Sequence, residues 1–490
     1  MQVRSKISNV GFSRWTSALM VDADFFFVGY YQTHTPYPFP HTTQKNNNMS
    51  LASVLGLLAT AGPDSVIYDD PQSTSWRYVH MRHTKFAIDN AAVTLQGTQK
   101  TGANTVTNLP REGDLITYLY VVIDLPGLSS GSYDTRVGQA LIERCQIFLG
   151  SQCIDEVTAE YLFMWDSLSG QAGKALGEMI GHDPDGIHPS GEYRDQRAQR
   201  LYVPIPFWFN SACPGGVTGN ALPLISLQFH AVTVKLNLRS IVGLASQDAT
   251  VQDNHGIDSI GMPLAAFNGG STALSDDQTQ VQLEVGYVYL DNEERSRFAD
   301  SNMEVLMSQV QQMTKKRSSN ATEQHRLYFN HPVSSLIWGV RQNPSHLFDF
   351  SGRVVDTTNS AGEHMADPIC SAQLKFNNHS RFNMAGGCSN SGGVPASYFR
   401  TVTPYQSHSR IPDASEGEFV YTYPFALQPE SAQPSGTVNF SRIDNAILEL
   451  CYDNKDSSSG EAQEHETHVF ARNWNILRIA SGMGGLAFSN

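Results

Sequence analysis

Charged residues are scarce in this chain. Of its 490 residues, 33 are Lys or Arg and 47 are Asp or Glu, so that charge accounts for 16%, against about 25% in an average globular domain. Apolar residues make up 40%, which is enough for a large core and excludes a charge-driven disordered protein. The formal net charge of −14 also argues against direct binding of nucleic acid, because such binding requires dense Lys and Arg to displace the phosphate counterions.

Long apolar runs are missing as well. A membrane-spanning helix needs about 20 apolar residues in succession. Here Ala18–Tyr31 is interrupted by Asp22 and Asp24, and Leu51–Ala61 has only 11 residues. Neither stretch has the basic, apolar and small-residue order of a cleavable signal. We therefore expect no transmembrane segment and no entry into the secretory pathway.

Cysteine is sparse and irregularly spaced. No Cys-x-x-Cys pair indicates zinc, and a turn at Gly150-Ser151 would place Cys145 opposite Glu156 and Cys153 opposite Phe148, so that these two cysteines should not bridge. We expect free, buried thiols in a reducing compartment rather than a disulfide framework. The six cysteines are Cys145, Cys153, Cys213, Cys370, Cys388 and Cys451.

Strand patterns dominate what is present. Leu115–Leu125 is β-branched and aromatic, and Val281–Tyr287 alternates apolar residues with polar residues or Gly. Because Gly, Asn, Asp and Pro clusters separate the runs, the pattern predicts sandwiches or barrels rather than alternating β-α units. Further strand-like runs are Cys145–Leu149, Leu222–Leu238, His325–Phe329, Ser335–Val340, Phe419–Leu427, Ile447–Tyr452 and His468–Ile479.

Two helices are predicted, and the longer one divides the chain. Asp291 and Glu294 form an N-terminal capping pattern, and near-helical apolar spacing after them predicts a linking helix over residues 291–313. A second helix is expected over Ala159–Leu168. The domains predicted from this are an irregular N-terminal arm (1–65), a first sandwich (66–290) and a second sandwich (291–490). The polar stretches 243–279 and 353–368 are expected to be surface loops.

Several motifs of enzymes occur without the context that their chemistry requires. Gly127–Gly131 matches the G-x-S-x-G nucleophile pattern, but no helix follows to receive the turn. Gly482–Ala487 fits a dinucleotide fingerprint, but only three residues follow it in this sequence, so we expect Gly482, Gly484 and Gly485 to pack a tail. We expect no catalytic residue, no cofactor-binding residue and no enzymatic activity.

Metal and glycan sites are not expected either. His80 and His83, like His465 and His468, are three residues apart, and such residues on a strand face opposite ways, so the expectation is exposed polar residues at strand ends. The basic cluster Lys315–Arg317 is expected at the end of the linking helix, where its charge suits the helix dipole. Four Asn-x-Ser/Thr sequons, at Asn48, Asn320, Asn378 and Asn439, are expected to be unmodified.

Several segments, in order along the chain, resemble the major capsid proteins of the nucleocytoplasmic large DNA viruses. The last two segments are the most diagnostic. The segments are Arg82–Ala87, Arg111–Ile116, Leu149–Asp155, Leu201–Phe209, Ala221–Ile225, Tyr289–Arg295, Asn330–Val333, Tyr398–Phe399, Pro404–Gln406, Gln433–Asp444 and Asn475–Asn490.

The resemblance implies an all-β fold of two tandem eight-stranded jelly-roll sandwiches, a double jelly roll, with a few short helices. It further implies a structural protein of a large icosahedral double-stranded DNA virus, with three copies forming a pseudo-hexagonal capsomer of the outer shell. Implied partners are the other two chains of a homotrimer, neighbouring capsomers and minor capsid proteins under the shell, with assembly in the host cytoplasm. Cofactors and direct nucleic-acid contacts are not implied.

Two alternatives remain open from the sequence. The chain could be a minor capsid paralogue at special lattice positions. It could also be a carbohydrate-binding jelly-roll protein, since a fold does not fix a function. Tyr202, Phe207, Trp208 and Phe209 could then form a stacking platform for sugars, although a Pro-punctuated strand favours packing in the core or at a subunit interface.

Overall fold

The computed structural model divides the chain into two compact units, Met1–Arg82 and His83–Asn490. The arm predicted for residues 1–65, the sequon at Asn48 and part of the Gly127–Gly131 motif lie outside the described residues. The structure describes residues 70, 72, 74, 76–128, 132–133, 136–170, 176–181, 198–213, 216–246, 274–313, 316–341, 347–348, 350, 352–355, 363–381, 393–414, 417–452 and 464–489.

The first sandwich consists of two antiparallel sheets whose strands all precede residue 291. One sheet has the order β1-β11-β3-β7, with β8 also paired to β3, and the other has the order β2-β9-β5-β6. Along β9, buried side chains alternate with half-buried ones, as expected for a sheet with one face in the core. The strands are β1 (Phe86–Thr94), β2 (Asn104–Asn108), β3 (Leu115–Leu125), β5 (Ile142–Leu149), β6 (Gln152–Thr158), β7 (Gln199–Pro204), β8 (Leu222–Pro223), β9 (Val232–Leu238) and β11 (Gln280–Leu290).

The second sandwich repeats this plan with strands that all follow residue 302. Its first sheet has the order β12-β24-β15-β21, with β13 and β25 paired to β24 and β22 to β15, and its second has the order β14-β23-β18-β19, with β20 paired to β18. The strands are β12 (Met303–Gln312), β13 (Lys316–Ser318), β14 (Thr322–Arg326), β15 (Pro332–Arg341), β18 (Ile369–Phe376), β19 (His379–Ser380), β20 (Val394–Pro395), β21 (Val420–Pro424), β22 (Val438–Asn439), β23 (Ala446–Tyr452), β24 (His465–Ala480) and β25 (Met483–Leu486).

Helices and two small ribbons complete the described part of the chain. The ribbons pair β4 (Ser132–Tyr133) with β10 (Ala245–Ser246) and β16 (Gly352–Val355) with β17 (Glu363–Ala366). The α-helices are α3 (Val137–Leu141), α4 (Ala159–Leu168), α5 (Gly177–Ile180), α6 (Asn292–Asp300) and α7 (Thr403–Ser407). The single turns are the 3-10 helices Thr218–Asn220, Ile241–Leu244, Asp276–Gln278 and Phe440–Arg442 and the π-helix Tyr398–Val402.

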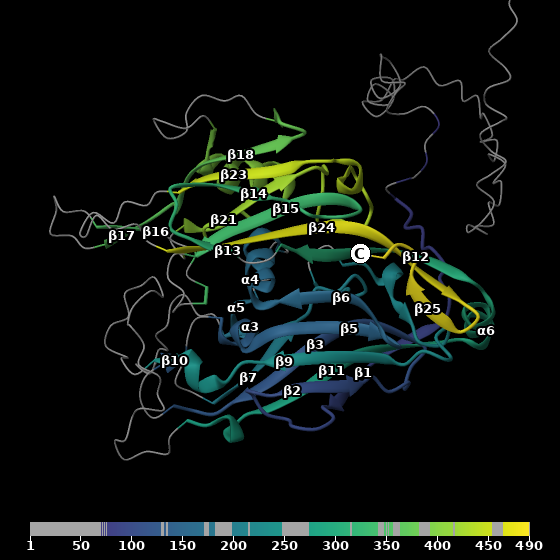
Figure 1. Ribbon diagram of the computed structural model, residues 1–490. Coiled ribbons are helices and arrows are strands. Elements are labelled where there is room, and N and C mark those ends of the chain that lie inside the picture. Colours follow the sequence, from purple (N-terminus) through teal and green to yellow (C-terminus); the bar gives the residue numbers. More distant parts are fainter. Residues whose placement is uncertain are drawn as a thin grey trace, which may run out of the picture. The chain divides into compact units, whose positions relative to one another are not determined.

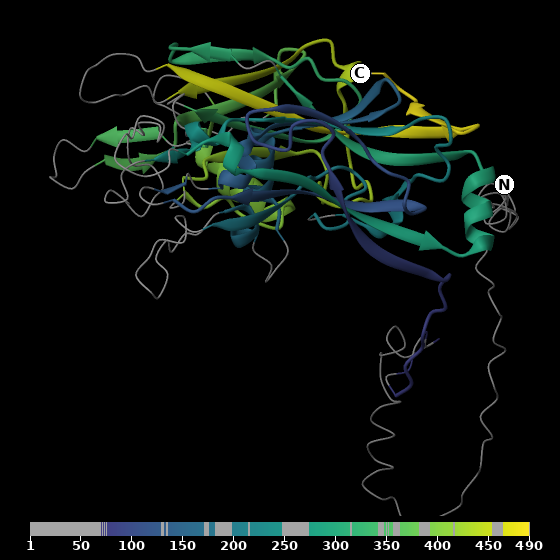
Figure 2. The same cartoon turned by 90° about the horizontal axis from the view of Figure 1, so that it is seen from below.

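Within the unit His83–Asn490, helix α4 lies between the two sandwiches (Figure 1). The buried apolar side chains of both sandwiches and of α4 form one continuous cluster. Helix α6 lies at one end of this unit, where β11 leaves the first sandwich, and both views show it there (Figures 1 and 2). No helix among the described residues is long and apolar enough to cross a membrane.

The prediction of a linking helix over residues 291–313 is wrong beyond residue 300. Helix α6 ends at Asp300, and Met303–Gln312 forms strand β12, paired with β24 along its whole length. Asp291 is the N-cap residue, but its side chain makes no capping hydrogen bond. Three of the five apolar residues of this strand, Met303, Val305 and Met307, also fall on odd positions, and this period of two prevails because β24 offers a partner for the backbone.

Three smaller expectations also need correction. A β-bulge between Ile147 and Phe148 places Cys145 opposite Val157 rather than Glu156, whereas Cys153 does lie opposite Phe148. Cys145, Cys153 and Cys213 are free, as expected, but Cys370 is disulfide-bonded, because sequence spacing does not show which cysteines the fold brings together. The stretch 353–368 is not all loop, since it contains most of the β16–β17 ribbon.

Candidate functional site: the junction between the two sandwiches

The surface where the first sandwich meets the second, which we call the junction, has helix α4 at its centre. All residues of α4 except Asp166 are buried. The helix therefore packs on both sandwiches and does not present a single apolar face. Phe163 stacks on Phe348 and Phe350 of the second half, with ring centroids 5.0 and 5.3 Å away. A side chain on Gly339 of β15 would place its Cβ 2.6 Å from Met164 Cε, so glycine is what allows α4 to approach this strand.

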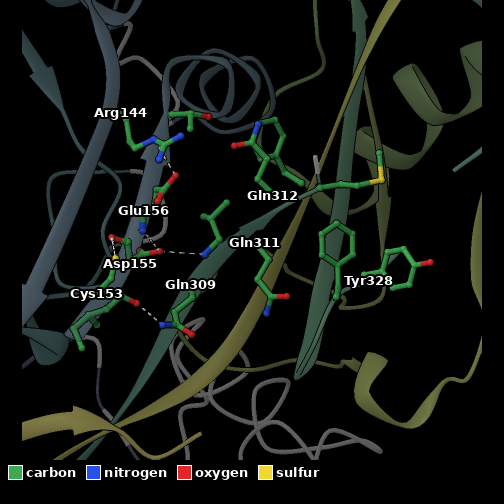
Figure 3. A pocket seen from close by; sticks show the side chains of 14 residues that line it. Arg144, Cys153, Asp155, Glu156, Gln309, Gln311, Gln312 and Tyr328 are labelled. Atoms are coloured by element: carbon green, nitrogen blue, oxygen red, sulfur yellow. Dashed lines mark hydrogen bonds and ion pairs between the residues drawn. The ribbon is translucent and has the colours of Figure 1, made fainter. Parts of the chain in front are cut away.

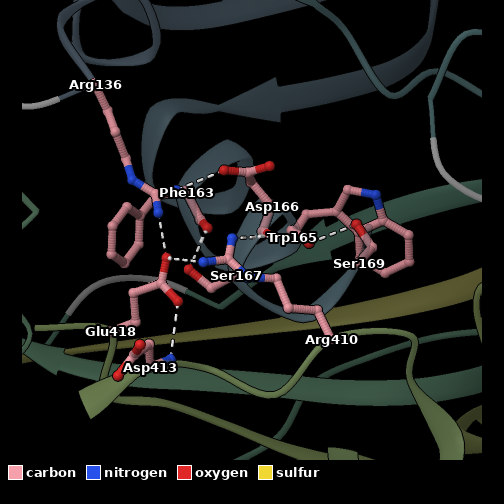
Figure 4. A network of polar contacts seen from close by, with 9 residues as sticks. All are labelled: Arg136, Phe163, Trp165, Asp166, Ser167, Ser169, Arg410, Asp413 and Glu418. Atoms are coloured by element: carbon pink, nitrogen blue, oxygen red, sulfur yellow. Dashed lines mark hydrogen bonds and ion pairs between the residues drawn. The ribbon is translucent and has the colours of Figure 1, made fainter. Parts of the chain in front are cut away.

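A buried network of ions lies beside α4 and crosses the junction (Figure 4). Arg136, from the first half, forms ion pairs with Asp166 of α4 at 2.6 Å and with Glu418 of the second half. Glu418 also lies 3.3 Å from the guanidinium of Arg410 and accepts a hydrogen bond from the backbone N–H of Asp413 at 3.0 Å. Arg136 and Glu418 are 2% and 0% exposed. The buried charges compensate one another, so removal of one member leaves the others without a partner. The network therefore stabilises the contact between the two sandwiches only when it is complete.

Arg136 is placed in this network by local backbone geometry. It has a left-handed conformation, with φ of 58°, and it is the N-cap residue of α3. Its guanidinium lies over the ring of Phe163, 4.9 Å from the centroid, which adds a cation–π contact to the ion pairs. The side chain is thereby directed across the junction.

Two edge strands meet at the other side of the junction, β6 of the first sandwich and β12 of the second (Figure 3). They do not form a backbone ladder, and side chains connect them instead. Asp155 Oδ1 accepts a hydrogen bond from the backbone N–H of Val310 at 3.2 Å. Gln309 donates from its side-chain amide to the carbonyl oxygen of Ile154. These bonds satisfy a backbone carbonyl of β6 and a backbone N–H of β12, which could otherwise pair with a further strand.

Asp155 is the titratable group at this contact. Its carboxyl is buried, and burial raises the pKa of Asp155 to about 7, although the N–H groups of Val310 and Glu156 oppose that shift by hydrogen bonding to the carboxylate. A cavity of about 690 Å³ opens beside it, lined by residues of both sandwiches. The junction therefore contains an ionisable group whose charge changes near neutral pH.

The C-terminal strand β25 ties the second sandwich to the first. Phe229 donates its backbone N–H to the carbonyl of Gly482 at 2.9 Å, and Leu486 donates to Gln152 Oε1 at 3.2 Å. At Gly484, an added Cβ would lie 2.6 Å from a methyl group of buried Leu227. The glycines thus let the tail lie flat on the first half, in agreement with the expectation of packing.

Helix α6, the part of the predicted linking helix that forms, contributes little to the junction. It has no buried residue. Arg295 pairs with Asp114 at 3.0 Å, and the carbonyl of Phe298 accepts a hydrogen bond from Ser226 at 2.7 Å. Both contacts reach back to the first half, so α6 closes the end of that sandwich rather than orienting the second.

The structure shows that His465 and His468 do not converge. His465 and His468 are buried, not exposed, and they contact different rings: Tyr452 at 3.7 Å for His465 and Phe350 at 5.9 Å for His468. They were expected at an exposed strand end, but the central position of β24 buries them. No group of three or more metal-ligating side chains occurs in the residues that the structure describes.

Other candidate residues occupy structural positions. Phe207, Trp208 and Phe209 are buried, so they offer no platform for sugars. Arg317 lies in β13 and pairs with Glu466 at 3.0 Å, which corrects its expected place at a helix end. The side chain of Asn439 accepts a hydrogen bond from the N–H of Ser441.

Comparison with known proteins agrees with this architecture. Residues 74–291 match a family model described as the N-terminus of the major capsid protein, and residues 294–485 match the large eukaryotic DNA virus major capsid protein. The chain belongs to the major capsid protein family of large eukaryotic DNA viruses. It is 31% identical to the major capsid protein of Pyramimonas orientalis virus over 458 residues, covering 89% of this chain and 99% of that protein.

A second relative has a solved structure. The major capsid protein of Paramecium bursaria Chlorella virus 1 is 30% identical over 479 residues, covering 89% of this chain and 98% of that protein. The structure of PBCV-1 VP54 is similar with a TM-score of 0.66 at 28% identity, covering 85% of this chain and 100% of that one. The Faustovirus major capsid protein shares the fold, with a TM-score of 0.62 at 12% identity, over 89% of this chain and 95% of that one.

These findings confirm the double jelly roll and the structural role. The chain is mostly β with a few short helices, and its four larger sheets form two jelly-roll sandwiches. Its family consists of structural capsid proteins rather than enzymes, and it assembles with other copies into the capsid shell of the virion. The junction is thus a site whose function is geometric, because it fixes how one sandwich is oriented on the other.

Proposed function

We propose that three copies of this chain form a homotrimeric capsomer with a pseudo-hexagonal outline, and that such capsomers tile the outer shell of an icosahedral capsid. Three chains with two similar sandwiches each present six similar edges. One sequence can then satisfy a hexagonal lattice while each capsomer keeps closed threefold symmetry. Minor capsid proteins under the shell and assembly in the host cytoplasm belong to the same proposal.

The observation that carries the proposal is the repeated plan of the two sandwiches. Each has two sheets whose main paths join four strands, and no sheet of the described residues contains strands from both sides of residue 291. We therefore place the domain boundary at residues 290 and 291, with the first jelly roll over 66–290 and the second over 291–490. The two matched family regions, 74–291 and 294–485, support this division.

Exposed apolar side chains support contacts with further copies. On the second sandwich, Tyr405 is 78% exposed in α7, with Val402 and Ile411 close in sequence at 38% and 42%. On the first, Phe86 and Ile88 are about half exposed on β1, which is the edge strand of its sheet. Open sheet edges and exposed apolar groups are typical of surfaces that are covered in an assembly.

Light scattering coupled to size-exclusion chromatography tests the proposal. The purified chain should elute at three times the mass of the monomer, and negative-stain images should show particles with a six-sided outline. Tyr405→Asp should reduce the trimer fraction if α7 lies at a subunit contact. Lys100→Gln, which also lowers the net charge by one unit and removes an exposed ion pair on the first sandwich, serves as the matched charge control. A monodisperse monomer at micromolar concentration and neutral pH would contradict the proposal.

A further inference from the structure

The residues that lead into strand β1 are basic and aromatic. The stretch 71–88 contains three cations, Arg77, Arg82 and Lys85, and no Asp or Glu. The formal net charge is −14 for the whole chain and +3 for this stretch, which leaves −17 for the other residues. We call residues 76–85 the basic segment.

Large apolar side chains of the basic segment are almost fully exposed. Trp76 is 96% exposed, Tyr78 84% and Met81 93%. The three cations are exposed as well, and no ion pair among the described residues involves them. Residues 78–85 lie in neither a helix nor a strand. Because a run of exposed apolar groups is typical of an interaction site, the basic segment is expected to have a partner.

The open edge of β1 offers groups that suit this segment. Among the described strands β1 pairs only with β11, so its other edge has unpaired backbone N–H and C=O groups. Side chains of β1 alternate between two faces. Phe86 and Ile88, each about half exposed, lie on one face, and exposed Asp89 lies on the other. A strand added here would meet apolar groups on one face and a carboxylate on the other.

Further carboxylates lie close to this edge. Tyr287 of β11 is opposite Asp89, and Gly113 packs against Tyr287. Beyond Tyr287, β11 leads directly into the first turn of α6. We call the open edge of β1, together with the carboxylates beside it, the acidic edge. In addition to Asp89, its exposed acidic residues are Glu112, Asp291 and Glu293.

Three arginines lie in the segments that border the acidic edge, and two of them are already bound. Arg295 pairs with Asp114 at 3.0 Å. Arg111 donates hydrogen bonds to the backbone carbonyls of Gln228 and His230 at 3.2 and 3.1 Å. The third arginine lies in α6, at position 297, and is left to offset four carboxylates. The acidic edge therefore keeps a net negative charge.

We propose that the basic segment of one chain pairs with the acidic edge of a second copy, as an added antiparallel strand. In the register that places Arg77 opposite Asp89, Tyr78 lies opposite Ile88. An ion pair then forms on one face of the sheet and an apolar pair on the other. Each chain gives one segment and receives one, so three copies close a ring with threefold symmetry. This inference rests on the proposed trimer and names one of its contacts.

Charge favours a second copy over other anionic partners. The part of the chain outside the stretch 71–88 carries −17 of the total of −14, and this charge would repel the phosphates of a membrane or of a nucleic acid. The acidic edge of another copy attracts the basic segment instead. Since the chain assembles with other copies into the capsid shell, such an edge is present at high local concentration.

Cysteine cross-linking in the full chain tests the pairing. Tyr78→Cys together with Ile88→Cys should give a covalent trimer with a short bismaleimide, seen on a denaturing gel. Tyr78→Cys together with Val106→Cys is the matched control, because Val106 is 48% exposed on β2, the edge strand of the opposite sheet. The control should stay monomeric on the gel.

An exchange of charges tests the register. Arg77→Asp should raise the concentration at which the trimer dissociates by several-fold in analytical ultracentrifugation, because two carboxylates then lie opposite each other. Asp89→Arg should have the same effect, since it places two cations opposite each other. The combination of both changes should restore the native value. No recovery in the combined variant would overturn the pairing.

Light scattering on the cross-linking samples separates this inference from the trimer itself. A trimer without the specific cross-link overturns the strand pairing and leaves the trimer intact. A specific cross-link in a dimer keeps the pairing and refutes the trimer, and a monomer without cross-links overturns both. A cross-link confined to the monomer band overturns the pairing, because the segment then folds back on its own chain. Flotation with phosphatidylserine vesicles, without a link between chains, also overturns it and assigns the segment to a membrane.

Discussion

Removal of one partner from the Arg136–Glu418 ion pair should loosen the junction. We expect Arg136→Met to lower the free energy of unfolding, because it leaves the carboxylate of Glu418 buried without its main cation. Breaking a buried pair in this way costs about 3–5 kcal/mol. Glu418 keeps the guanidinium of Arg410 at 3.3 Å and the N–H of Asp413 at 3.0 Å, so the lower end, about 3 kcal/mol, applies. Met keeps the unbranched apolar stem of Arg136 but loses the guanidinium that lies over Phe163.

The double variant separates the pair from the packing. Glu418→Gln alone should also cost about 3 kcal/mol, since Arg136 then keeps only Asp166 as an anionic partner. The combination of both changes should cost less than the sum of the two, with a coupling of about 1–3 kcal/mol. Urea unfolding at one fixed protein concentration measures all four proteins, because association with other copies would otherwise shift the midpoints.

An exposed ion pair of the second sandwich is the matched control. Arg478 and Glu304 lie 2.7 Å apart, with side chains 63% and 55% exposed. Arg478→Met should therefore cost no more than about 1 kcal/mol. If Arg136→Met costs as little as Arg478→Met, or if the two junction changes are additive, the network does not hold the sandwiches together and the reasoning fails.

Three further predictions concern the same junction. Gly484→Ala should lower stability by about 1–3 kcal/mol in urea unfolding, because its Cβ would meet buried Leu227 at 2.6 Å, whereas Gly219→Ala, with open space around its Cβ, should change little; equal effects would contradict this. Asp155 has a pKa raised from 3.8 to about 7 in the folded protein, so the stability that its protonated form contributes is complete below about pH 4 and is lost as the pH rises through 7. The unfolding midpoint of Asp155→Asn should therefore fall less than that of the native chain between about pH 5 and 8. Parallel profiles of the two proteins would refute the assignment. Asp291→Ala with Glu294→Ala should cost about 1 kcal/mol or less and leave the particle yield in negative stain intact, since α6 has no buried residue; a loss of particles would return the orienting role to α6.

Local sequence patterns predict helix or strand correctly where tertiary contacts favour the same secondary structure. Ala159–Leu168 is a helix with the predicted bounds, and Leu115–Leu125 is a strand with the predicted bounds. Met303–Gln312 shows the opposite case, because its apolar residues fit both a helical and a strand spacing. Pairing with β24, more than 150 residues later in the chain, decides between them.

The junction itself could not be predicted from the sequence. Arg136 and Glu418 are separated by 282 positions, and nothing near either residue indicates the other. Asp155 occupies an ordinary polar position of a hairpin, where its carboxylate accepts a hydrogen bond from the N–H of Glu156. The second hydrogen bond, from the N–H of Val310, exists only because β12 approaches. The bulge at Ile147 and Phe148 changes the register by one residue, which no count from the turn at Gly150 reveals. Long-range contacts of this kind are decided by the whole fold.

Strand β24 has a consequence for the order of events during synthesis. It lies between β12 and β15 in its sheet, and its hairpin partner β25 reaches back to the first sandwich. A nascent chain exposes the long edges of β12 and β15 until residues 465–480 have left the ribosome. Closure of such distant pairs is slow, and open edges are prone to aggregation. The second jelly roll therefore completes only after translation has passed residue 480, so a prematurely terminated chain cannot present a finished edge to the growing shell.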